Sequence, residues 1–270
     1  MTKRIGVLYF SPTNTTKMIC DAVASGMGRE DPQTFNLTLP SIRRQICDNP
    51  DGATANIDHL IVGAPVYFGK LPSRFTECLR SIRGSGKECS AIVVYGNRDY
   101  GIALYQMVEI LSNNGFGVIG AGAFIGQHSY SDVVPVAIGR PDKSDIEKAN
   151  CFGANSLSAS GYLPLSSIPV QRDIFSKSDM YMPLKPVFIS DLCVQCGICA
   201  KYCPEGILSS ETGMNLSRAA EKQCIGCMAC VMRCKTKARV ARPNVMLKLA
   251  MRFILRRASM ERQEPLTIFP

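Results

Sequence analysis

Apolar runs and amphipathic segments alternate along the first 160 residues of the chain. Continuous apolar runs predict buried strands at residues 4–9, 60–64, 88–96 and 116–126, and a weaker run predicts one more at residues 33–37. Apolar residues at helical spacing predict helices at residues 14–27, 71–83, 99–115 and 142–157. Strands that alternate with amphipathic helices favour a parallel sheet covered on both faces.

The pattern breaks after residue 160, and it divides the chain into four segments. Residues 1–160 form the predicted α/β domain, and residues 161–186 are rich in proline and serine, as in a linker. Residues 187–242 form a cysteine-rich unit. Residues 243–270 contain a predicted basic amphipathic helix, residues 244–259, and a tail.

Composition indicates an ordinary water-soluble protein. Hydrophobic residues make up 46% of the chain and charged residues 20%. No uncharged apolar run approaches ~18 residues, so the sequence predicts no membrane-spanning helix. The N-terminal residues lack the apolar core and cleavage site of a signal peptide. We therefore expect a cytoplasmic protein whose 13 cysteines do not form disulfides.

Eight of the cysteines form two runs, each with the spacing C-x2-C-x2-C-x3-C. Three thiolates in such a tight loop can converge on three irons of one cubic cluster, and the fourth must come from further away. Zinc sites usually pair two C-x2–4-C units across a longer gap, so the doubled run favours iron–sulfur clusters over zinc or disulfides. The other five cysteines are scattered singly, as small buried hydrophobes or unreactive thiols are.

The doubled run resembles that of bacterial two-cluster ferredoxins, in which the fourth cysteine of each run binds the other cluster. The resemblance implies two [4Fe-4S] clusters. The first would be held by Cys193, Cys196, Cys199 and Cys234, and the second by Cys203, Cys224, Cys227 and Cys230. Lys235 stands where a proline usually follows the second run. Residues 206–217 between the runs predict a hairpin that joins two similar halves.

The stretch SPTNTT, residues 11–16, joins the first predicted strand to the first predicted helix. Amides at a helix N-terminus can bind a phosphate together with nearby hydroxyls, here those of Ser11, Thr13, Thr15 and Thr16. Serine and threonine are also common at ordinary helix starts, so this loop alone does not identify a phosphate site. Asn14 is one of the few residue types besides glycine that adopt a left-handed backbone conformation.

Two further loops follow predicted strands: PVYFG at residues 65–69 and GNRDY at residues 96–100. Doubly wound sheets bind ligands at the carboxyl ends of their strands, where all three loops lie. We expect Tyr67 and Tyr100 to lie against a planar ring; alternatively, they only cover the top of the sheet. We expect Asn97 and the backbone of Gly96 and Arg98 to hydrogen-bond the polar edge of that ring.

On these three loops, residues 1–160 resemble a flavodoxin, and the whole chain resembles flavodoxin–ferredoxin fusion proteins of anaerobic bacteria and archaea. The resemblance implies a flavodoxin-like, doubly wound, five-stranded parallel sheet, then a small α+β two-cluster ferredoxin-like domain and a C-terminal helix. It implies FMN as the flavin. The implied binding residues are Ser11, Thr13, Asn14, Thr15, Thr16, Pro65, Val66, Tyr67, Phe68, Gly69, Gly96, Asn97, Arg98 and Tyr100.

Two other features near these loops carry weaker predictions. The stretch GFGVIG, residues 115–120, matches a dinucleotide-binding motif, but it follows a helix and enters a strand, which is the opposite order. We expect Gly115 to end the helix. His128 follows the fourth strong strand and is a candidate proton donor to a substrate or to reduced flavin, although a histidine in a polar loop is often only solvated.

Positive charge is concentrated at the C-terminus: residues 181–270 contain 14 basic and 6 acidic residues. We expect the last helix to pack across the domains with its basic face in water. Docking of an acidic electron-transfer partner and contact with a membrane surface are the alternatives. Bound clusters and a flavin phosphate would lower the net charge, so we expect no nucleic-acid partner, and we expect no membrane contact.

Together these features predict an electron-transfer iron–sulfur flavoprotein, an oxidoreductase or electron carrier, that passes electrons between the clusters and FMN in anaerobic redox metabolism. Its partner would be a redox protein, either a ferredoxin-type donor or an acceptor reductase. One alternative is an FMN-dependent reductase of a small acceptor of quinone, nitro or enone type, fed by the ferredoxin domain. Another is a non-catalytic redox sensor or docking module.

Overall fold

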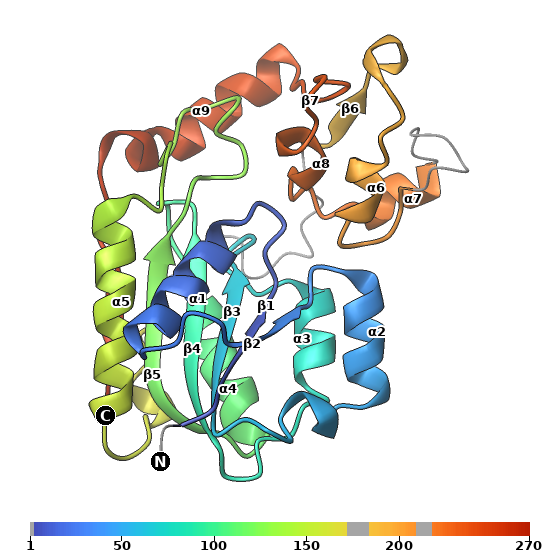
Figure 1. The fold of residues 1–270 in the computed structure, drawn as a ribbon. Coiled ribbons are helices and arrows are strands. Elements are labelled where there is room, and N and C mark those ends of the chain that lie inside the picture. The colour runs from blue at the N-terminus through green and yellow to red at the C-terminus, as the bar shows by residue number, and fades with distance from the viewer. Residues whose placement is uncertain (1–2, 172–183, 209–217) are drawn as a thin grey trace.

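The computed structural model describes residues 3–171, 184–208 and 218–270 (Figure 1). Two regions are distinct. The sheet region comprises residues 3–171 and the tail after residue 261, and the cysteine region comprises residues 184–242. Helix α9 (Val245–Met260) connects them and crosses above the ends of the strands. Within the described residues, no helix is long and apolar enough to cross a membrane.

The sheet has six strands in the order β2-β1-β3-β4-β5-β8. The first five run parallel, and their order is that of flavodoxin-like doubly wound sheets. The strands are β1 (Ile5–Tyr9), β2 (Gln33–Asn36), β3 (His59–Pro65), β4 (Glu88–Tyr95), β5 (Gly117–Ile125) and β8 (Leu266–Ile268). The predicted doubly wound parallel sheet is confirmed.

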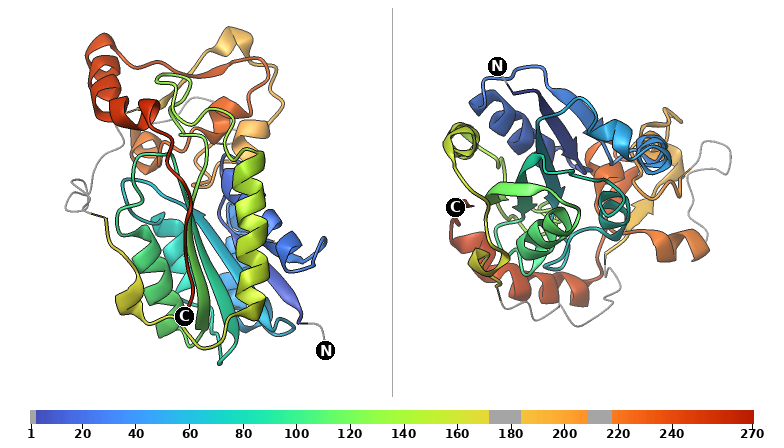
Figure 2. Two further views of the ribbon diagram at one scale, coloured as in Figure 1. Left: turned by 90° about the vertical axis from the view of Figure 1, so that its left-hand side faces the viewer. Right: turned by 90° about the horizontal axis from the view of Figure 1, so that it is seen from below.

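A sixth, antiparallel strand extends the five predicted parallel strands. The chain returns from α9 along the outer edge of the sheet, and β8 pairs antiparallel with β5 (Figure 2). The tail therefore belongs to the sheet region, although 140 residues separate β8 from β5 in the sequence. Such a short strand has no periodic pattern that sequence analysis could detect.

Helices cover both faces of the sheet, as predicted. α1 (Thr15–Gly26) and α5 (Lys143–Ser158) pack together on one face, where Gly26 and Gly153 allow close contact because a Cβ at either would overlap the other helix. α2 (Pro40–Asp48), α3 (Ser73–Leu79) and α4 (Ala103–Asn113) lie on the other face. α2 was not predicted, since Ile46 is its only buried residue.

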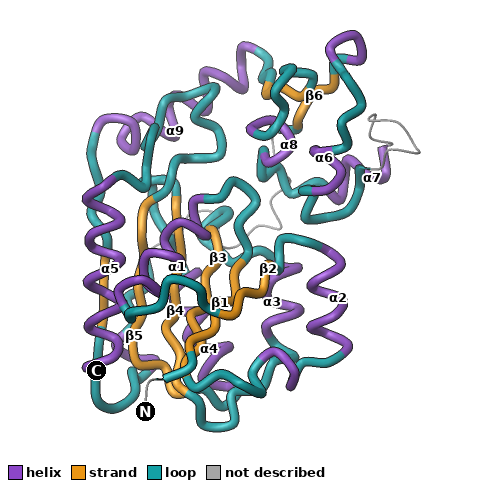
Figure 3. The backbone as a smooth tube through the Cα atoms, in the orientation of Figure 1, coloured by secondary structure: helices purple, strands orange, loops and turns teal. Residues whose placement is uncertain are grey.

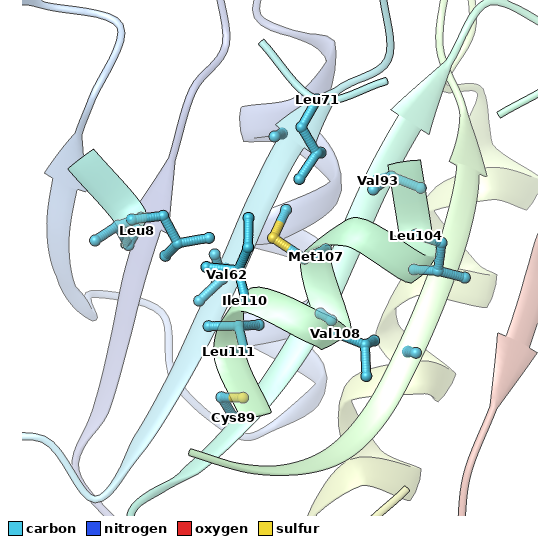
Figure 4. Packing of buried hydrophobic residues seen from close by; sticks show 14 of the residues in the cluster. Leu8, Val62, Leu71, Cys89, Val93, Leu104, Met107, Val108, Ile110 and Leu111 are labelled. Atoms are coloured by element: carbon cyan, nitrogen blue, oxygen red, sulfur yellow. The ribbon is translucent and has the colours of Figure 1, made fainter. Parts of the chain in front are cut away.

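Alternate residues of each central strand enter two separate hydrophobic cores. Leu8, Val62 and Val93 pack with α4 in one core (Figure 4). Their neighbours Val7 and Ile61 face α1 and α5 in the other. This double burial explains why the strands appear as continuous apolar runs in the sequence.

The cysteine region contains little regular structure (Figure 3). β6 (Pro186–Phe188) pairs antiparallel with β7 (Arg239–Ala241), and the helices are α6 (Ile198–Lys201), α7 (Arg218–Gln223) and α8 (Ala229–Met232). Of the single 3-10 turns, one lies in this region, at Ser190–Leu192. Those in the sheet region are Asp51–Ala53 and Leu165–Ser167. Most of the predicted hairpin at residues 206–217 lies outside the described residues.

Part of the predicted linker packs as structured chain. Leu163 and Ile168 are buried in the core beside α4. Residues 172–183 of this segment lie outside the described residues. The N-terminal part of the segment therefore extends the sheet region.

Candidate functional site

A cavity lies at the carboxyl ends of the parallel strands, with an interior volume of about 180 Å³. Four loops of the sheet region line it, and the cysteine region and α9 close it. From the predicted set it collects Thr13, Thr15, Pro65, Val66, Tyr67, Phe68, Gly69, Gly96, Arg98 and His128. The remaining lining residues are Val94, Tyr95, Asp99, Gly126, Gln127, Ser129, Tyr130, Gly226, Met251, Ile254 and Leu255.

Asn14 has a φ of 73°, in the left-handed region, and it directly precedes the first turn of α1. The predicted backbone conformation of this asparagine is confirmed. Ser11 fixes the loop, because its Oγ accepts a hydrogen bond of 3.0 Å from the Lys17 amide. The Ser11 amide donates to Thr38 Oγ1 at 2.7 Å. Ser11 and Asn14 thus shape the loop from behind the cavity wall.

The loop retains donors for an anion. Thr13 and Thr15 line the cavity, and the first-turn amides of α1 have no acceptor within the helix. Thr16 is not among the residues that line the cavity, but its hydroxyl is buried and has no hydrogen-bond partner among the described residues. Buried hydroxyls are usually paired, so an unpaired one in the first turn of a helix fits a site for a phosphate.

The second loop is a tight turn. Tyr67 and Lys70 exchange two backbone hydrogen bonds of 2.9 and 3.1 Å, and Phe68 and Gly69 between them have φ values of 51° and 71°. Gly101 presses against the turn, since a Cβ there would lie 2.5 Å from the backbone of Gly69. The turn holds Tyr67 in the cavity wall, where burial, and secondarily Cys227, raises the pKa of its hydroxyl well above the usual value.

Asn97 does not face the cavity, contrary to its predicted contact with a ring edge. Its Nδ2 donates to the carbonyl oxygens of Ala258 and Glu261, each at 2.7 Å. Its Oδ1 accepts from the Gln263 amide at 2.9 Å and from Arg140 at 3.2 Å. All four hydrogen-bonding positions of the amide are used. Asn97 therefore anchors the C-terminal segment over the sheet.

Tyr100 also lies away from the cavity. It is 4% exposed and packs in the hydrophobic core, with its ring 5.6 Å from that of Tyr95. The alternative interpretation, in which a tyrosine covers the sheet, applies to this residue. Tyr95 and Tyr130 line the cavity instead. Tyr130 follows a strand end just as Tyr67 does, and the same reasoning could have identified it.

His128 lines the cavity as a neutral imidazole. Its Nδ1 accepts a hydrogen bond of 3.1 Å from the Tyr130 amide, which assigns the ring proton to Nε2. Burial, and then the positive charge of Arg98, lowers the pKa of His128 to about 4. Gly96 makes room for the ring, since a Cβ there would lie 2.4 Å from it. His128 is thus a structured donor rather than a solvated loop residue.

The eight clustered cysteines line two small pockets in the cysteine region. One pocket contains Cys203, Cys224, Cys227 and Cys230. The other contains Cys193, Cys196, Cys199 and Cys234. This is the division that the ferredoxin resemblance implies. In the described part of the chain, no three cysteine, histidine or acidic side chains are close enough to hold a single metal ion.

A buried cation lies between the two sets. Arg239 lines both pockets, is 2% exposed and stacks over the Phe188 ring at 4.6 Å. Burial raises the pKa values of the Cys199 and Cys230 thiols, that of Cys230 to about 12, and the Arg239 charge opposes both shifts. Thiols in such surroundings ionise only when a cation or metal compensates the charge. Arg239 therefore suits anionic clusters on both sides.

Polar contacts seat the cysteine region on the sheet region. Arg43 donates to the carbonyl of Pro204, and Arg74 pairs with Glu205 at 3.1 Å. Arg233 stacks over the Tyr202 ring and donates to the carbonyl of Pro12 in the first loop, at 3.3 Å from Nη2. These contacts bring the loop between Cys224 and Cys227 against the cavity, where Gly226 forms part of the wall.

Residues 185–235 match the family model described as a 4Fe-4S dicluster domain. A curated relative, the archaeal glutamate synthase (NADPH) of Archaeoglobus fulgidus, is 32% identical over 54 residues, which are 20% of this chain. The match covers only 11% of that relative.

Similar solved structures include a flavodoxin from the domain Archaea, with a TM-score of 0.41, 16% identity and coverage of 57% of this chain and 96% of that one. Rubredoxin oxygen:oxidoreductase from Desulfovibrio gigas has a TM-score of 0.43, 15% identity and coverage of 57% and 36%. By its strand order and its matched segment, the chain joins a flavodoxin-like sheet to a ferredoxin-like iron–sulfur region.

Proposed function

We propose that this protein is an electron-transfer iron–sulfur flavoprotein that passes electrons between two [4Fe-4S] clusters and FMN in anaerobic metabolism. One observation carries the proposal. Gly226, which lies between Cys224 and Cys227, forms part of the wall of the cavity at the strand ends. A flavin in that cavity and a cluster on the second cysteine set would be neighbours.

The chain's own residues fit FMN in this cavity. Thr13, Thr15 and Thr16, with the first amides of α1, would hold the phosphate. Tyr67 and Tyr95 supply aromatic walls for the ring. When bound, a flavin exchanges electrons in pairs or singly, whereas each cluster exchanges one.

The arrangement supports an order of electron transfer. The set with Cys203 and Cys227 adjoins the cavity, whereas none of the described residues in the Cys193–Cys199 loop lines it. Electrons from a redox protein would therefore enter at the first set and reach the flavin through the second. We propose a ferredoxin-type donor or an acceptor reductase as that partner, and no nucleic acid or membrane.

α9 supplies an apolar wall of the cavity. Met251 and Leu255 are both 5% exposed and line the cavity, while Asn97 holds the end of the helix in place. Exclusion of water strengthens electrostatic contacts within a site and limits side reactions of reduced intermediates. The helix thereby favours controlled transfer of electrons over reaction with solvent.

The first test is cofactor analysis of anaerobically purified protein. Two clusters and one FMN predict about eight irons and one flavin per chain, and fewer than about six irons would contradict the two-cluster assignment. Steady turnover with a ferredoxin-type donor would exclude the sensor alternative.

The second test addresses the phosphate site. Thr16→Val removes only the unpaired hydroxyl, and we expect roughly 10- to 100-fold weaker FMN binding, the effect of losing a hydrogen bond to a charged group. Iron content should not change. Thr34→Val, at an exposed site in β2, is the matched control. Full retention of FMN by Thr16→Val would refute the phosphate assignment.

One observation favours the second candidate, an FMN-dependent reductase of a small quinone, nitro or enone acceptor. His128 is neutral and carries its proton on Nε2 in the cavity wall, so it can donate a hydrogen bond to an acceptor oxygen. Turnover of a quinone by the reduced holoprotein would support this activity. The turnover rate should fall in His128→Phe but not in the Thr34→Val control. No turnover of any of the three acceptor types would contradict it.

A further inference from the structure

Tyr130 has a hydroxyl that nothing in the proposed electron path yet uses. The residue is 9% exposed and lines the cavity. Its hydroxyl oxygen is buried and has no hydrogen-bond partner among the described residues. Because buried polar groups are nearly always paired, this group is expected to meet a partner that the polypeptide does not supply.

The surroundings of Tyr130 point toward the second cysteine set. Its ring packs in a hydrophobic cluster with Met228 and Val231, against which Cys230 also packs. The Tyr130 hydroxyl lies within electrostatic range of Cys224 and Cys227. A tyrosine phenol is protonated at neutral pH, so it can act as a donor toward sulfur.

The loop around Tyr130 is held rigidly. The Tyr130 amide donates to His128, and its carbonyl accepts from the amides of Val133 and Val134 at 2.9 and 3.0 Å. Ser131 Oγ lies 2.8 and 2.7 Å from the carbonyl oxygens of His128 and Val136, which share its one hydroxyl proton. The backbone thus fixes the tyrosine between the cavity and the cysteines.

We propose that the Tyr130 hydroxyl donates a hydrogen bond to a sulfur of the cluster held by Cys203, Cys224, Cys227 and Cys230, and so raises its reduction potential. This inference rests on the proposed function. Reduction adds negative charge to a cluster, and a hydrogen bond to its sulfurs stabilises the reduced form more than the oxidised form. Tyr130 would thus set the energy of the electron at the step next to the flavin.

Tyr130→Phe removes the hydroxyl and keeps the ring. We expect one cluster midpoint to fall, corresponding to about a tenfold smaller equilibrium constant for reduction, or about 59 mV for a one-electron couple. The other cluster and the flavin should keep their midpoints. The measurement is an anaerobic redox titration of the holoprotein, followed by electron paramagnetic resonance for the clusters and by absorbance for the flavin.

Tyr100→Phe is the matched control, because Tyr100 is also buried, lies outside the cavity, and none of the groups that shift the pKa of its hydroxyl is a cysteine. It should leave both cluster midpoints unchanged.

A second measurement uses the unmodified protein. Exchange into deuterated water should reveal an exchangeable proton coupled to one reduced cluster, and Tyr130→Phe should abolish that signal.

Unchanged cluster midpoints in Tyr130→Phe, or a shift confined to the flavin, would overturn this inference, as would absence of the exchangeable proton. The iron and flavin contents of the same samples show whether the Tyr130 inference alone has failed or the proposed function has failed as well. If the unmodified protein holds two clusters and FMN and only the Tyr130 test fails, the proposed function stands.

Discussion

The two regions of this chain are stabilised in different ways. In the sheet region, every residue of β1, β3 and β5 is buried, and the strands enter hydrophobic cores on both faces. In the cysteine region, α6 and α8 have four residues each, β6 is only partly buried, and Val194 is 68% exposed. Helices this short are not stable alone, and small domains without a large core usually need metals or cross-links. The clusters would therefore act as the core of the cysteine region.

Removal of the clusters should give the largest effect and tests this contrast directly. We expect the cysteine region to unfold without iron, because structural metal sites commonly contribute on the order of 10 kcal/mol to folding. The sheet region should stay folded. Limited proteolysis of iron-free protein, with the fragments identified by mass spectrometry, should cut within residues 184–242 and spare residues 3–171.

Cys47→Ser is the control for this experiment, because Cys47 is exposed and belongs to neither set. Its iron content and proteolysis pattern should equal those of the unmodified protein. If the iron-free cysteine region resisted proteolysis as well as the sheet region does, the contrast between the regions would be wrong.

The next effect concerns a polar contact inside the sheet region. Arg140 pairs with Asp145 through two hydrogen bonds, and their side chains are 5% and 0% exposed. Arg140 also donates to the carbonyl of Gln263 at 2.8 Å and so connects the tail to the sheet. Asp145→Ala would leave a buried, unpaired guanidinium, and we expect a loss of about 3–5 kcal/mol in the free energy of unfolding.

Chemical denaturation followed by circular dichroism measures this loss. Lys143→Ala is the control, because Lys143 is 92% exposed and its pair with Glu147 at 3.9 Å should contribute less than about 1 kcal/mol. Cluster absorbance in native buffer should not change in either variant. A loss below 1 kcal/mol in Asp145→Ala would show that the sheet region does not depend on this pair.

The free energy of unfolding of the sheet region should also depend on pH, by an amount similar to or smaller than the loss in Asp145→Ala. His59 is fully buried, bonds Ser90 Oγ at 2.9 Å, and has its pKa lowered to about 4 by burial, which outweighs the attraction of Glu88. Its unfolded pKa is about 6.5, so the unfolded state binds the extra proton first as the pH falls. The stabilisation is complete above pH 6.5 and is lost toward pH 4, by roughly 3 kcal/mol at most.

Urea unfolding of the holoprotein between pH 7 and 5 measures this slope. His59→Gln should flatten it, although His128, with a similarly lowered pKa, should retain part of it. An unchanged slope in His59→Gln would assign the pH dependence to other groups. The cysteine region should contribute little here, since both histidines of the chain lie in the sheet region.

Much of this architecture could be predicted because its signals are local. Strands buried on both faces appear as continuous apolar runs, and the cysteine spacing divides the eight thiols as the two pockets do. Gly115, predicted to end a helix, has a φ of 82° and follows the last turn of α4. In each case a short stretch of sequence contains the physical cause of the structure.

The parts that were missed depend on distant contacts. Asn97 and Tyr100 follow a strand end as predicted, but the returning C-terminal segment takes up the amide of Asn97, and Tyr100 enters the core. β8 forms only because the edge of β5 is available to it. The wall of the cavity at Gly226 requires the cysteine region to fold back onto the sheet. No pattern within a single segment predicts such contacts between distant segments.

The smallest expected effect concerns Asn14, the residue with a left-handed backbone in the first loop. Its backbone is already left-handed, so Asn14→Gly relieves strain of at most about 1 kcal/mol and also makes the unfolded chain more flexible. FMN affinity, measured by fluorescence quenching, should therefore change less than about threefold. Asn14→Val should weaken binding more, because a β-branched residue tolerates this conformation poorly. A tenfold gain in FMN affinity for Asn14→Gly would mean that asparagine strains the first loop. The strain would then weaken cofactor binding even in the well-packed sheet region.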